Sequence, residues 1–292
     1  MDYKVDVALP VFGESEKLIR CLTDFTINTH VFYKLWIVDD FSPERFKKSL
    51  SKVYKKFSDY KTYPNIKVEK RPFNCGFGWT VNHAVAKGTS EYILLANSDV
   101  YVTDSCVDRM VEALDTKPEV GVVGAKLLFP DSLRTENGIS LEQRQRIARE
   151  IANTIQHAGV YFQGPIERVP PELYGLPFHK WGGFSRDYSE ACISRYVPCV
   201  TGALLMTRRS IWQELDGMDW RTYKRGAMED VEYCLACRDL GHKIWYEASA
   251  VAYHHQWGSG RDTTHKFADI NREALMKRWG DRIKPGGDLH TA

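Results

Sequence analysis

Asn97, Ser98 and Asp99 form a candidate site because they place a carboxylate beside other polar side chains directly after an apolar run. The run, residues 92–96, carries no charge, and such a segment predicts a strand buried on both faces, as in a parallel sheet. Open α/β sheets bind ligands at the carboxyl ends of their strands. A carboxylate there suits a hard divalent cation, which proteins often use to neutralise phosphate. Taken alone, the tripeptide is better explained as a polar turn.

A second candidate is the acidic pair Glu229 and Asp230, which opens a helical pattern. Val231, Cys234 and Leu235 are spaced as one face of a helix over residues 228–238, so both carboxyl groups fall in its first turn. The helix dipole stabilises negative charge there. Helix capping therefore explains the pair unless a reaction needs a base at this position.

The composition is that of an ordinary globular protein, with 292 residues, 43% hydrophobic and 27% charged. Forty basic and thirty-eight acidic residues give a net charge of +2. This balance excludes the strong overall field typical of nonspecific nucleic-acid binding, although a local basic patch remains compatible with it.

The seven cysteines are scattered and odd in number, which predicts reduced thiols in the core. Cys234 and Cys237 have metal-like spacing, but no second pair accompanies them. The amino terminus lacks an apolar signal-like segment, and no run of eighteen uncharged apolar residues predicts a transmembrane segment. We therefore expect a cytoplasmic protein, with peripheral attachment to a membrane surface as an option.

The first half alternates between strand and helix patterns. Strands are predicted over residues 5–11, 35–38, 66–69 and 92–96, and helices over 15–26, 44–57 and 79–86. This alternation implies right-handed parallel crossovers and a doubly wound sheet. Polar or glycine-rich loops follow the strands, so these loops should line one crevice.

Two of these loops have recognisable chemistry. Asp39 and Asp40 can accept hydrogen bonds from a nucleoside, or Asp40 can cap the next helix. Gly76 and Gly78 allow the backbone to approach a ligand closely. A third glycine and the following acidic residue of a dinucleotide fingerprint are missing, which argues against a nicotinamide cofactor.

The second half begins with a segment that does not alternate between strand and helix patterns. Residues 131–198 read as a long insertion, with a helix over 141–155 and an aromatic-rich stretch after it. Its aromatic residues either stack on sugar or form a small core; these are Tyr161, Phe162, Trp181 and Phe184. A strand is predicted over 197–206, a helix capped by Ser210 after it, a strand over 248–253 and a last helix over 266–279.

Taken in order, these motifs resemble the nucleotide-sugar-dependent glycosyltransferases of family 2, which have the GT-A fold, and most closely their rhamnosyltransferase-like branch. The resemblance covers about residues 5–260. It rests on Leu9-Pro10-Val11-Phe12-Gly13-Glu14, Ile37-Val38-Asp39-Asp40-Phe41-Ser42, Asn74-x-Gly76-Phe77-Gly78 with Asn82, Asn97-Ser98-Asp99, Gly202-Ala203-Leu204-Leu205-Met206-x-Arg208-Arg209, Gly217-Met218-Asp219, Glu229-Asp230-Val231-Glu232 and His254-His255.

The resemblance implies an α/β, Rossmann-like GT-A domain, with a mostly parallel central sheet and helices on both faces. This single domain would span residues 1–262. Residues 1–125 would be the nucleotide-sugar-binding half, and 126–262 the acceptor-binding half with the insertion 131–198. Residues 263–292 would add a C-terminal helix and tail.

The resemblance also implies a donor site and a divalent metal, Mn²⁺ or Mg²⁺. Asp99 would bind the metal together with His254, with His255 as the alternative, since strand alternation points the two rings to opposite faces. Asn97 stands where many relatives have aspartate, so one carboxylate ligand is expected. The nucleotide sugar would be bound by Pro10, Val11, Glu14, Asp39, Asp40, Arg71, Asn74, Gly76, Asn82, Asn97, Ser98 and Gly202.

The expected activity is metal-dependent transfer of a sugar, with inversion, from a UDP- or dTDP-sugar to a hydroxyl group. The family places the catalytic base in the acidic pair, and we prefer Asp230 to Glu229. A glycan or lipid-linked glycan is the expected acceptor, with a protein or a nucleic acid as further options. The alternatives are a nucleotidyltransferase on the same type of sheet and a non-catalytic module that binds nucleotide sugars or glycans.

Overall fold

The alternating first half folds as predicted into strands and helices that succeed one another along the chain. In this computed structural model, which describes residues 2–131, 151–164, 174–255 and 261–283, the first strands are parallel neighbours. Their bounds are β1 (Val5–Val11), α1 (Ser15–Asn28), β2 (Tyr33–Asp39), α2 (Glu44–Phe57), β3 (Ile66–Lys70), α3 (Phe77–Val85) and β4 (Tyr92–Ala96).

Three further elements follow that the sequence analysis did not predict. They are β5 (Val100–Val102), α4 (Cys106–Thr116) and β6 (Val120–Leu128). All nine residues of β6 are buried. Its apolar run is the pattern of a strand covered on both faces, so the signal for this central strand was present in the sequence.

The insertion contributes short strands to the edges of the fold. The remaining elements are β7 (Ile155–His157), β8 (Val160–Phe162), β9 (Pro177–His179), a 3₁₀ turn (Ser189–Cys192), β10 (Arg195–Tyr196), β11 (Leu204–Arg208), α6 (Arg209–Glu214), α7 (Glu229–Asp239), β12 (Lys243–His254), α8 (Arg261–Trp279) and a last 3₁₀ turn (Gly280–Arg282). Most of the helix predicted over 141–155, and the loop after His255, lie outside the described residues.

Two boundary predictions in the second half were wrong. The strand predicted over 197–206 begins only at Leu204, because the N–H groups of Thr201 and Gly202 donate to the side chains of His157 and Asp230 instead of to a neighbouring strand. The helix after it begins at Arg209, and no side chain caps it. Ser210 is therefore not its N-cap.

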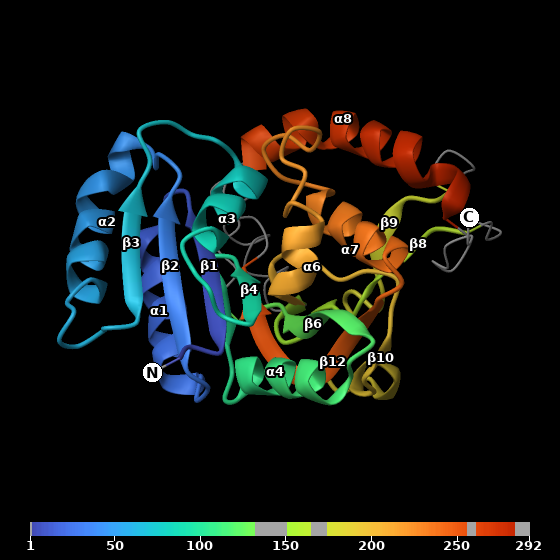
Figure 1. Cartoon of the computed structure of the whole chain (residues 1–292), viewed down its shortest axis with the longest axis horizontal. Helices are drawn as coiled ribbons and strands as arrows, with labels where there is room; N and C mark the ends of the chain where they lie inside the picture. Colours follow the sequence, from blue (N-terminus) through green and yellow to red (C-terminus); the bar gives the residue numbers. More distant parts are fainter. Residues whose placement is uncertain (1, 132–150, 165–173, 256–260, 284–292) are drawn as a thin grey trace.

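The sheet is mixed: six of its ten described strands run in one direction, whereas β11 at the centre and the short strands β5, β7 and β10 run against them. Its order is β10-β12-β6-β11-β4-β1-β2-β3, with β5 paired to β12 and β7 to β6. β11 is antiparallel to both β4 and β6, whereas β6 and β12 are parallel to each other. Figure 1 shows the blue first half and the orange and green second half as parts of one continuous sheet.

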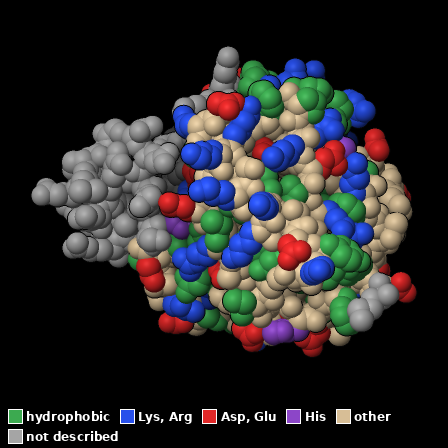
Figure 2. Space-filling view, turned by 90° about the vertical axis from the view of Figure 1, so that its left-hand side faces the viewer, with side chains coloured by type: hydrophobic (Ala, Val, Ile, Leu, Met, Phe, Trp, Pro, Cys, Tyr) green, Lys and Arg blue, Asp and Glu red, His purple; other side chains and the backbone are tan. Residues whose placement is uncertain are grey.

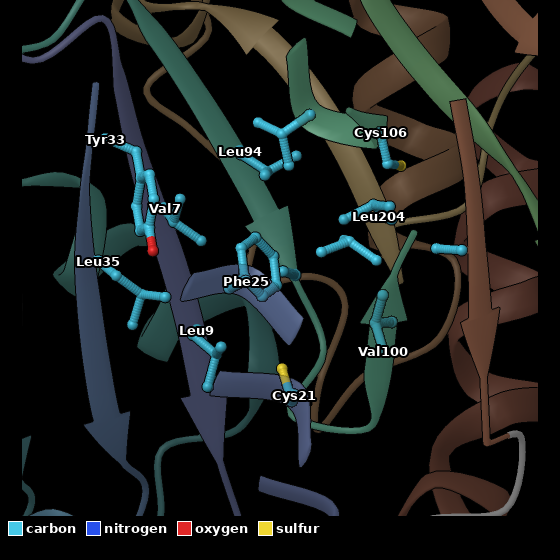
Figure 3. Packing of buried hydrophobic residues seen from close by; sticks show 14 of the residues in the cluster. Val7, Leu9, Cys21, Phe25, Tyr33, Leu35, Leu94, Val100, Cys106 and Leu204 are labelled. Atoms are coloured by element: carbon cyan, nitrogen blue, oxygen red, sulfur yellow. The ribbon is translucent and has the colours of Figure 1, made fainter. Parts of the chain in front are cut away.

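Helices cover both faces of the sheet, as predicted. The core on one face is formed with α1, α2 and α4, and Figure 3 shows Cys21 and Phe25 of α1 packed against Leu9 of β1 and Leu94 of β4. The core on the other face is formed with α3, α6, α7 and α8. Since both faces are covered, the open end of the strands is where polar side chains can gather.

Two arginines fix β11 at the centre of the sheet. Arg208 donates from Nε to the carbonyl of Val120 at 2.9 Å and from Nη2 to that of Leu114 at 2.7 Å. Arg209 forms a 2.7 Å ion pair with Asp6, which is buried in β1. This pair of arginines, which belongs to the family motif, therefore has a structural role.

One side of the molecule is strongly basic. Figure 2 shows Lys and Arg side chains gathered on the side formed by α2 and β3. α2 contributes six of them against a single acidic residue, Glu44: Arg45, Lys47, Lys48, Lys52, Lys55 and Lys56. None of the helices described in the structure has the length and apolar character needed to cross a bilayer.

Candidate active site

The predicted site residues lie at one end of the sheet. Asp39 ends β2, Asp99 follows β4, and His254 ends the parallel strand β12. Gly202 precedes β11, and because β11 runs antiparallel to β4, with Leu204 opposite Ala96, it reaches this same end. The backbone N–H of Asn97 donates to the carbonyl of Ala203 at 2.9 Å, which joins the two loops directly.

The carboxylates of Asp39 and Asp40 organise the loops of this end. Asp39 accepts hydrogen bonds from the N–H of Ser42 at 2.8 Å and from the hydroxyl of Tyr54 at 2.9 Å. Asp40 accepts from the N–H groups of Cys75 and Gly76 at 2.7 and 2.8 Å. Burial raises the pKa of Asp40, although these two hydrogen bonds oppose the rise.

The loop that leads into α3 is close to a second loop from the C-terminal half. Gly76 has a left-handed φ of 87°, and a Cβ there would lie 3.1 Å from the Cα of Arg225. Arg225 also donates from Nη1 to the carbonyl of Asn74 at 3.2 Å. Arg225 therefore brings a positive charge to this loop, in addition to Arg71. The sequence analysis did not identify it.

Three predicted nucleotide-binding residues have protein partners. The amide group of Asn82 donates to the carbonyl of Met218 at 2.9 Å and accepts from its N–H at 3.0 Å, so Asn82 fixes the loop before α7. Glu14 pairs with Lys17 at 2.5 Å. The guanidinium of Arg71 lies over the ring of Trp79, 4.4 Å from its centre.

Pro10 and Val11 end the central strand β1. They lie opposite Val38 and Asp39 of β2. The carbonyl of Val11 accepts the N–H of Asp40 at 2.9 Å, which fixes the position of the acidic loop relative to β1. Ser98 lies between Asn97 and Asp99 and is half-buried.

Asp99 and His254 are brought together as predicted for a pair of ligands. Asp99 Oδ1 lies 3.4 Å from His254 Nε2, and both side chains are largely buried. Burial works against the ionised form of Asp99, but the neighbouring His254 ring outweighs it and holds the pKa of Asp99 below its ordinary value. The amide of Asn97 lies 3.3 Å from the same ring nitrogen.

Gln156, which the sequence analysis missed, fixes the orientation of His254. Its Nε2 donates to the backbone carbonyl of His254 at 2.9 Å, and its Oε1 is 2.6 Å from His254 Nδ1. Since Oε1 only accepts, Nδ1 carries a proton, and Nε2 is the ring nitrogen that faces the carboxylate of Asp99. Two acceptors at this distance repel unless a proton or a cation lies between them.

His255 has a different environment. It is buried, and its ring makes an edge contact with Tyr101, 5.3 Å between centres. Burial lowers the pKa of His255 to about 4, so the ring is neutral at neutral pH. Its backbone N–H donates to the carbonyl of Asp99 at 3.1 Å, which holds the end of β12 against that loop.

The residues present fit a divalent cation that is completed by a ligand. Two donors of one octahedral ion lie about 3 Å apart, given metal–oxygen distances of about 2.1 Å. The 3.4 Å between Asp99 Oδ1 and His254 Nε2 is close to that separation, and the imidazole is held in its metal-binding tautomer. In the described part of the chain, no three His, Cys, Asp or Glu side chains gather around one point. Phosphate oxygens or water would therefore supply the other ligands.

Asp230 is the carboxylate that faces the start of β11. Its Oδ2 accepts the N–H of Gly202 at 2.7 Å, and its Oδ1 accepts the N–H of Val231 at 2.8 Å. A Cβ on Gly202 would lie only 3.0 Å from the Cβ of Asp230. Glycine at 202 therefore lets this carboxylate approach the backbone closely.

Glu229 is buried beside Asp230. Its Oε2 has no hydrogen-bond partner among the described residues. Burial, followed by the charge of Asp230, raises the pKa of Glu229 from about 4.5 to about 8. Glu229 is therefore protonated at neutral pH, and the acidic pair carries one negative charge instead of two.

The turn before the acidic pair has a strained backbone, and hydrogen bonds from α8 stabilise it. Four successive residues have positive φ: Arg225, Gly226, Ala227 and Met228, at 64°, 101°, 82° and 74°. The fully buried Asn271 of α8 donates to the carbonyls of Gly226 and Ala227 at 3.0 Å. α8 thus stabilises a conformation that non-glycine residues rarely adopt.

The aromatic residues of the insertion divide into three groups by their exposure to solvent. Phe162 is fully buried and belongs to the core. Tyr161 and Trp181 are half-buried, and the Lys180 ammonium lies over both rings, 4.4 and 4.7 Å from their centres. Phe184 is exposed and packs on Tyr188.

Similarity to solved structures defines the fold as GT-A. The chain superposes with a TM-score of 0.59 and 12% identity on the mannosyltransferase PcManGT from Pyrobaculum calidifontis in complex with GDP-Man and Mn²⁺, over 95% of this chain and 65% of that one. For GalNAc-T7 with UDP, GalNAc and Mn²⁺, the TM-score is 0.62 at 13% identity, over 88% and 44%.

The sequence comparison identifies the family. The model of glycosyl transferase family 2 matches residues 6–211, and this chain belongs to that family. The chain is 31% identical over 217 residues to the uncharacterized protein y4gI of Sinorhizobium fredii, and 30% identical over 215 residues to the O-antigen biosynthesis protein RfbC of Myxococcus xanthus. These matches cover 72% and 71% of this chain but only 20% and 14% of those proteins.

A third relative is covered over most of its length. The N-acetylglucosaminyl-diphospho-decaprenol L-rhamnosyltransferase of Mycobacterium tuberculosis is 24% identical over 226 residues, 73% of this chain and 67% of that protein. Asp99 lies inside the part matched by the family model, whereas Asp230 and His254 follow it. The case for these two residues therefore rests on their geometry.

The raised pKa of Glu229 predicts a specific pH dependence of stability. Between about pH 4.5 and 8 the folded protein binds a proton that the unfolded chain has released, so the free energy of unfolding falls as pH rises through this window. The loss is at most about 1.4 kcal/mol per pH unit. Glu229→Gln removes the titrating group, so the variant should lose less stability than the wild type between pH 5 and pH 9 in urea unfolding.

Glu112→Gln is the matched control because Glu112 is exposed on α4. This variant should keep the wild-type pH dependence. An identical pH dependence of the wild type and Glu229→Gln would show that Glu229 is ionised in the folded protein at neutral pH.

Proposed function

We propose that this chain is a metal-dependent glycosyltransferase that moves a sugar, with inversion, from a UDP- or dTDP-sugar to a hydroxyl group of a glycan. Family membership supports the transferase class. The observation that carries the finer proposal is the gathering of the Asp99–His254 pair and the Asp230 carboxylate at one end of the sheet. The Asp99–His254 pair suits the binding of a diphosphate with its cation, and the Asp230 carboxylate suits a catalytic base.

Asp230 is the proposed base for the acceptor hydroxyl. Inversion needs a single carboxylate within hydrogen-bond reach of the attacking oxygen. The hydrogen bonds from Gly202 and Val231 fix the direction of this carboxylate and leave further lone pairs on its oxygens. Glu229, protonated beside it, contributes by limiting the charge of the pair.

Asp99 and His254 are the proposed protein ligands of Mn²⁺ or Mg²⁺. A bound divalent cation would act as a Lewis acid that stabilises the charge of the departing nucleoside diphosphate. Gln156 keeps the Nε2 lone pair of His254 directed toward this position. Two solved structures that share the fold are complexes with Mn²⁺, which supports a divalent metal for this chain as well.

The nucleoside is proposed to lie along the loops after β1, β2 and β3. Asp39, Asp40 and Asn74 are tied into these loops, so they would shape the nucleoside site mainly through the backbone they hold. Arg225, which reaches the carbonyl of Asn74, adds a positive charge for an anionic nucleotide. The proposed division is a donor half over residues 1–125 and an acceptor half over 126–262.

A glycan linked to a lipid diphosphate is the proposed acceptor. The mycobacterial relative is named for transfer to N-acetylglucosaminyl-diphospho-decaprenol, and the Myxococcus relative for O-antigen biosynthesis. The insertion places Tyr161 and Trp181 on this half of the chain, and half-buried aromatic rings suit a sugar ring.

Substitution of the two aspartates should separate binding from chemistry. Asp230→Asn should lower transfer from UDP- or dTDP-hexoses by about 10²–10⁴-fold because it removes the base, and leave nucleotide binding unchanged. Asp99→Asn should weaken Mn²⁺-dependent nucleotide binding as well. Release of the nucleoside diphosphate measures the first effect, and calorimetry with UDP and dTDP the second.

Asp239→Asn provides the control, since Asp239 ends the same helix and pairs with Arg282. It should behave as the wild type in both assays. Wild-type transfer rates in Asp230→Asn would remove the assignment of the base.

We also propose that a cytoplasmic pool of the protein attaches to anionic membrane surfaces through α2. Five of its cations have no carboxylate partner within the described residues: Arg45, Lys48, Lys52, Lys55 and Lys56. They line or flank a groove of about 500 Å³ between α1 and α2 that also contains Ile19. Each cation near an anionic surface contributes about 1 kcal/mol of binding.

Co-sedimentation with vesicles checks this attachment. The wild type should sediment with phosphatidylglycerol-containing vesicles at low salt and remain in solution with pure phosphatidylcholine. The double variant Lys48→Glu/Lys52→Glu should lose the binding by at least tenfold. Equal sedimentation of wild type and variant would exclude α2 as the attachment surface.

A further inference from the structure

Three histidines surround the strand β7 on the second half of the site. His157 belongs to β7 itself, His179 ends β9, and His254 ends β12. The rings of His157 and His179 make an edge contact, 5.0 Å between centres. Gln156 joins the other two: its side chain holds His254, and its backbone carbonyl accepts a hydrogen bond from His179 Nδ1 at 3.0 Å.

Two of these histidines have partners at both ring nitrogens. His157 donates from Nδ1 to the carbonyl of Ala125 at 3.1 Å and accepts the N–H of Thr201 at Nε2 at 3.2 Å. His254 contacts Gln156 through Nδ1 and faces Asp99 through Nε2. The ring of His157 is therefore occupied by protein partners, and that of His254 faces the candidate metal position.

His179 has one free ring nitrogen. Its Nδ1 donates to the carbonyl of Gln156, which leaves Nε2 with no partner among the described residues. Burial lowers the pKa of His179, so the ring is neutral at neutral pH and Nε2 presents a lone pair. Protein atoms surround most of the ring, but part of the surface of the residue remains exposed to solvent.

The position of His179 relates it to both halves of the proposed reaction. Its Nδ1 donates to Gln156, the residue that also holds the candidate metal ligand His254, and its ring packs against His157. The neighbouring ring of His157 receives the N–H of Thr201, and the next N–H, that of Gly202, goes to Asp230. His179 thus packs against the histidine that holds the backbone next to the candidate base.

We propose that His179 Nε2 accepts a hydrogen bond from a sugar hydroxyl next to Asp230 and so positions the sugar for transfer. This inference rests on the proposed glycosyltransferase function. A neutral imidazole whose Nδ1–H is occupied can only accept at Nε2, so its partner must be an O–H or N–H donor. Sugar hydroxyls are such donors, whereas phosphate oxygens are acceptors.

Binding and kinetics of His179→Leu and His179→Gln test the proposal. The affinity of each variant for UDP and dTDP with Mn²⁺ should equal that of the wild type, because no phosphate contact is lost. If the hydroxyl belongs to the donor sugar, His179→Leu should bind UDP-glucose, UDP-N-acetylglucosamine or dTDP-rhamnose about three- to tenfold more weakly than the wild type does. If it belongs to the acceptor, the KM for the glycan acceptor should rise by a similar factor and the KM for the donor should stay constant.

His179→Gln provides the rescue, since its amide oxygen can accept the same hydrogen bond and should restore most of the loss. His30→Leu is the control, because His30 is exposed, pairs with Asp104 and precedes β2, whose opposite end carries Asp39. Unchanged nucleotide-sugar affinity together with unchanged acceptor KM in His179→Leu would overturn the inference, as would an equal loss of UDP affinity. Absence of nucleotide binding by the wild type would instead contradict the proposed function itself.

Discussion

The pairing of β11 between β4 and β6 is the constraint on which the site depends. β11 runs antiparallel to both neighbours, so its first residues meet the last residues of β4 and the carboxyl ends of the parallel strands. This brings Gly202, and through it Asp230, to the same end of the sheet as Asp99 and His254. Arg208 and Arg209 hold the strand in place through backbone carbonyls and the buried Asp6.

The site is further stabilised by polar groups, almost all of which have hydrogen-bond partners. Asp40 holds the loop before α3, Asn82 holds Met218, and Asn271 holds the strained turn before Glu229. A buried polar network with satisfied partners fixes one geometry, since each unmade hydrogen bond would cost free energy. Within the described residues, Glu229 Oε2 and His179 Nε2 are two polar atoms near Asp230 that lack such partners.

The charge distribution fits the same account. Glu229 is kept neutral by burial and by the charge of Asp230, so one carboxylate of the pair is ionised. At the candidate metal position, His254 lowers the pKa of Asp99 although the carboxyl group of Asp99 is buried. The site thus separates the proposed base on α7 from the carboxylate proposed to bind a cation on the loop after β4.

Local patterns allowed most of the first half to be predicted. The apolar run before Asn97 is long and uncharged, so β4 and its polar end were recognised, and the motif order indicated the family. β6 has an equally clear apolar pattern but was overlooked. The strand predicted before Leu204 failed because Thr201 and Gly202 donate to side chains of β7 and α7, which no local pattern reveals.

Residues that act through distant partners could not be predicted. Gln156 meets His254 across 98 positions of sequence, and Arg225 meets Asn74 across 151. Neither belongs to a periodic segment or to a motif. Their roles follow from the sheet order, which brings the insertion and the loop before α7 next to the ends of strands formed much earlier or later in the chain.

The measurement that tests this account most directly is calorimetric titration of the protein with UDP, dTDP and GDP in the presence and absence of Mn²⁺. If Asp99 and His254 hold a cation that the diphosphate completes, UDP or dTDP should bind at least tenfold more tightly with Mn²⁺ than without it, because binding to a shared ion couples the two affinities. Equal affinities with and without Mn²⁺ would contradict the central claim.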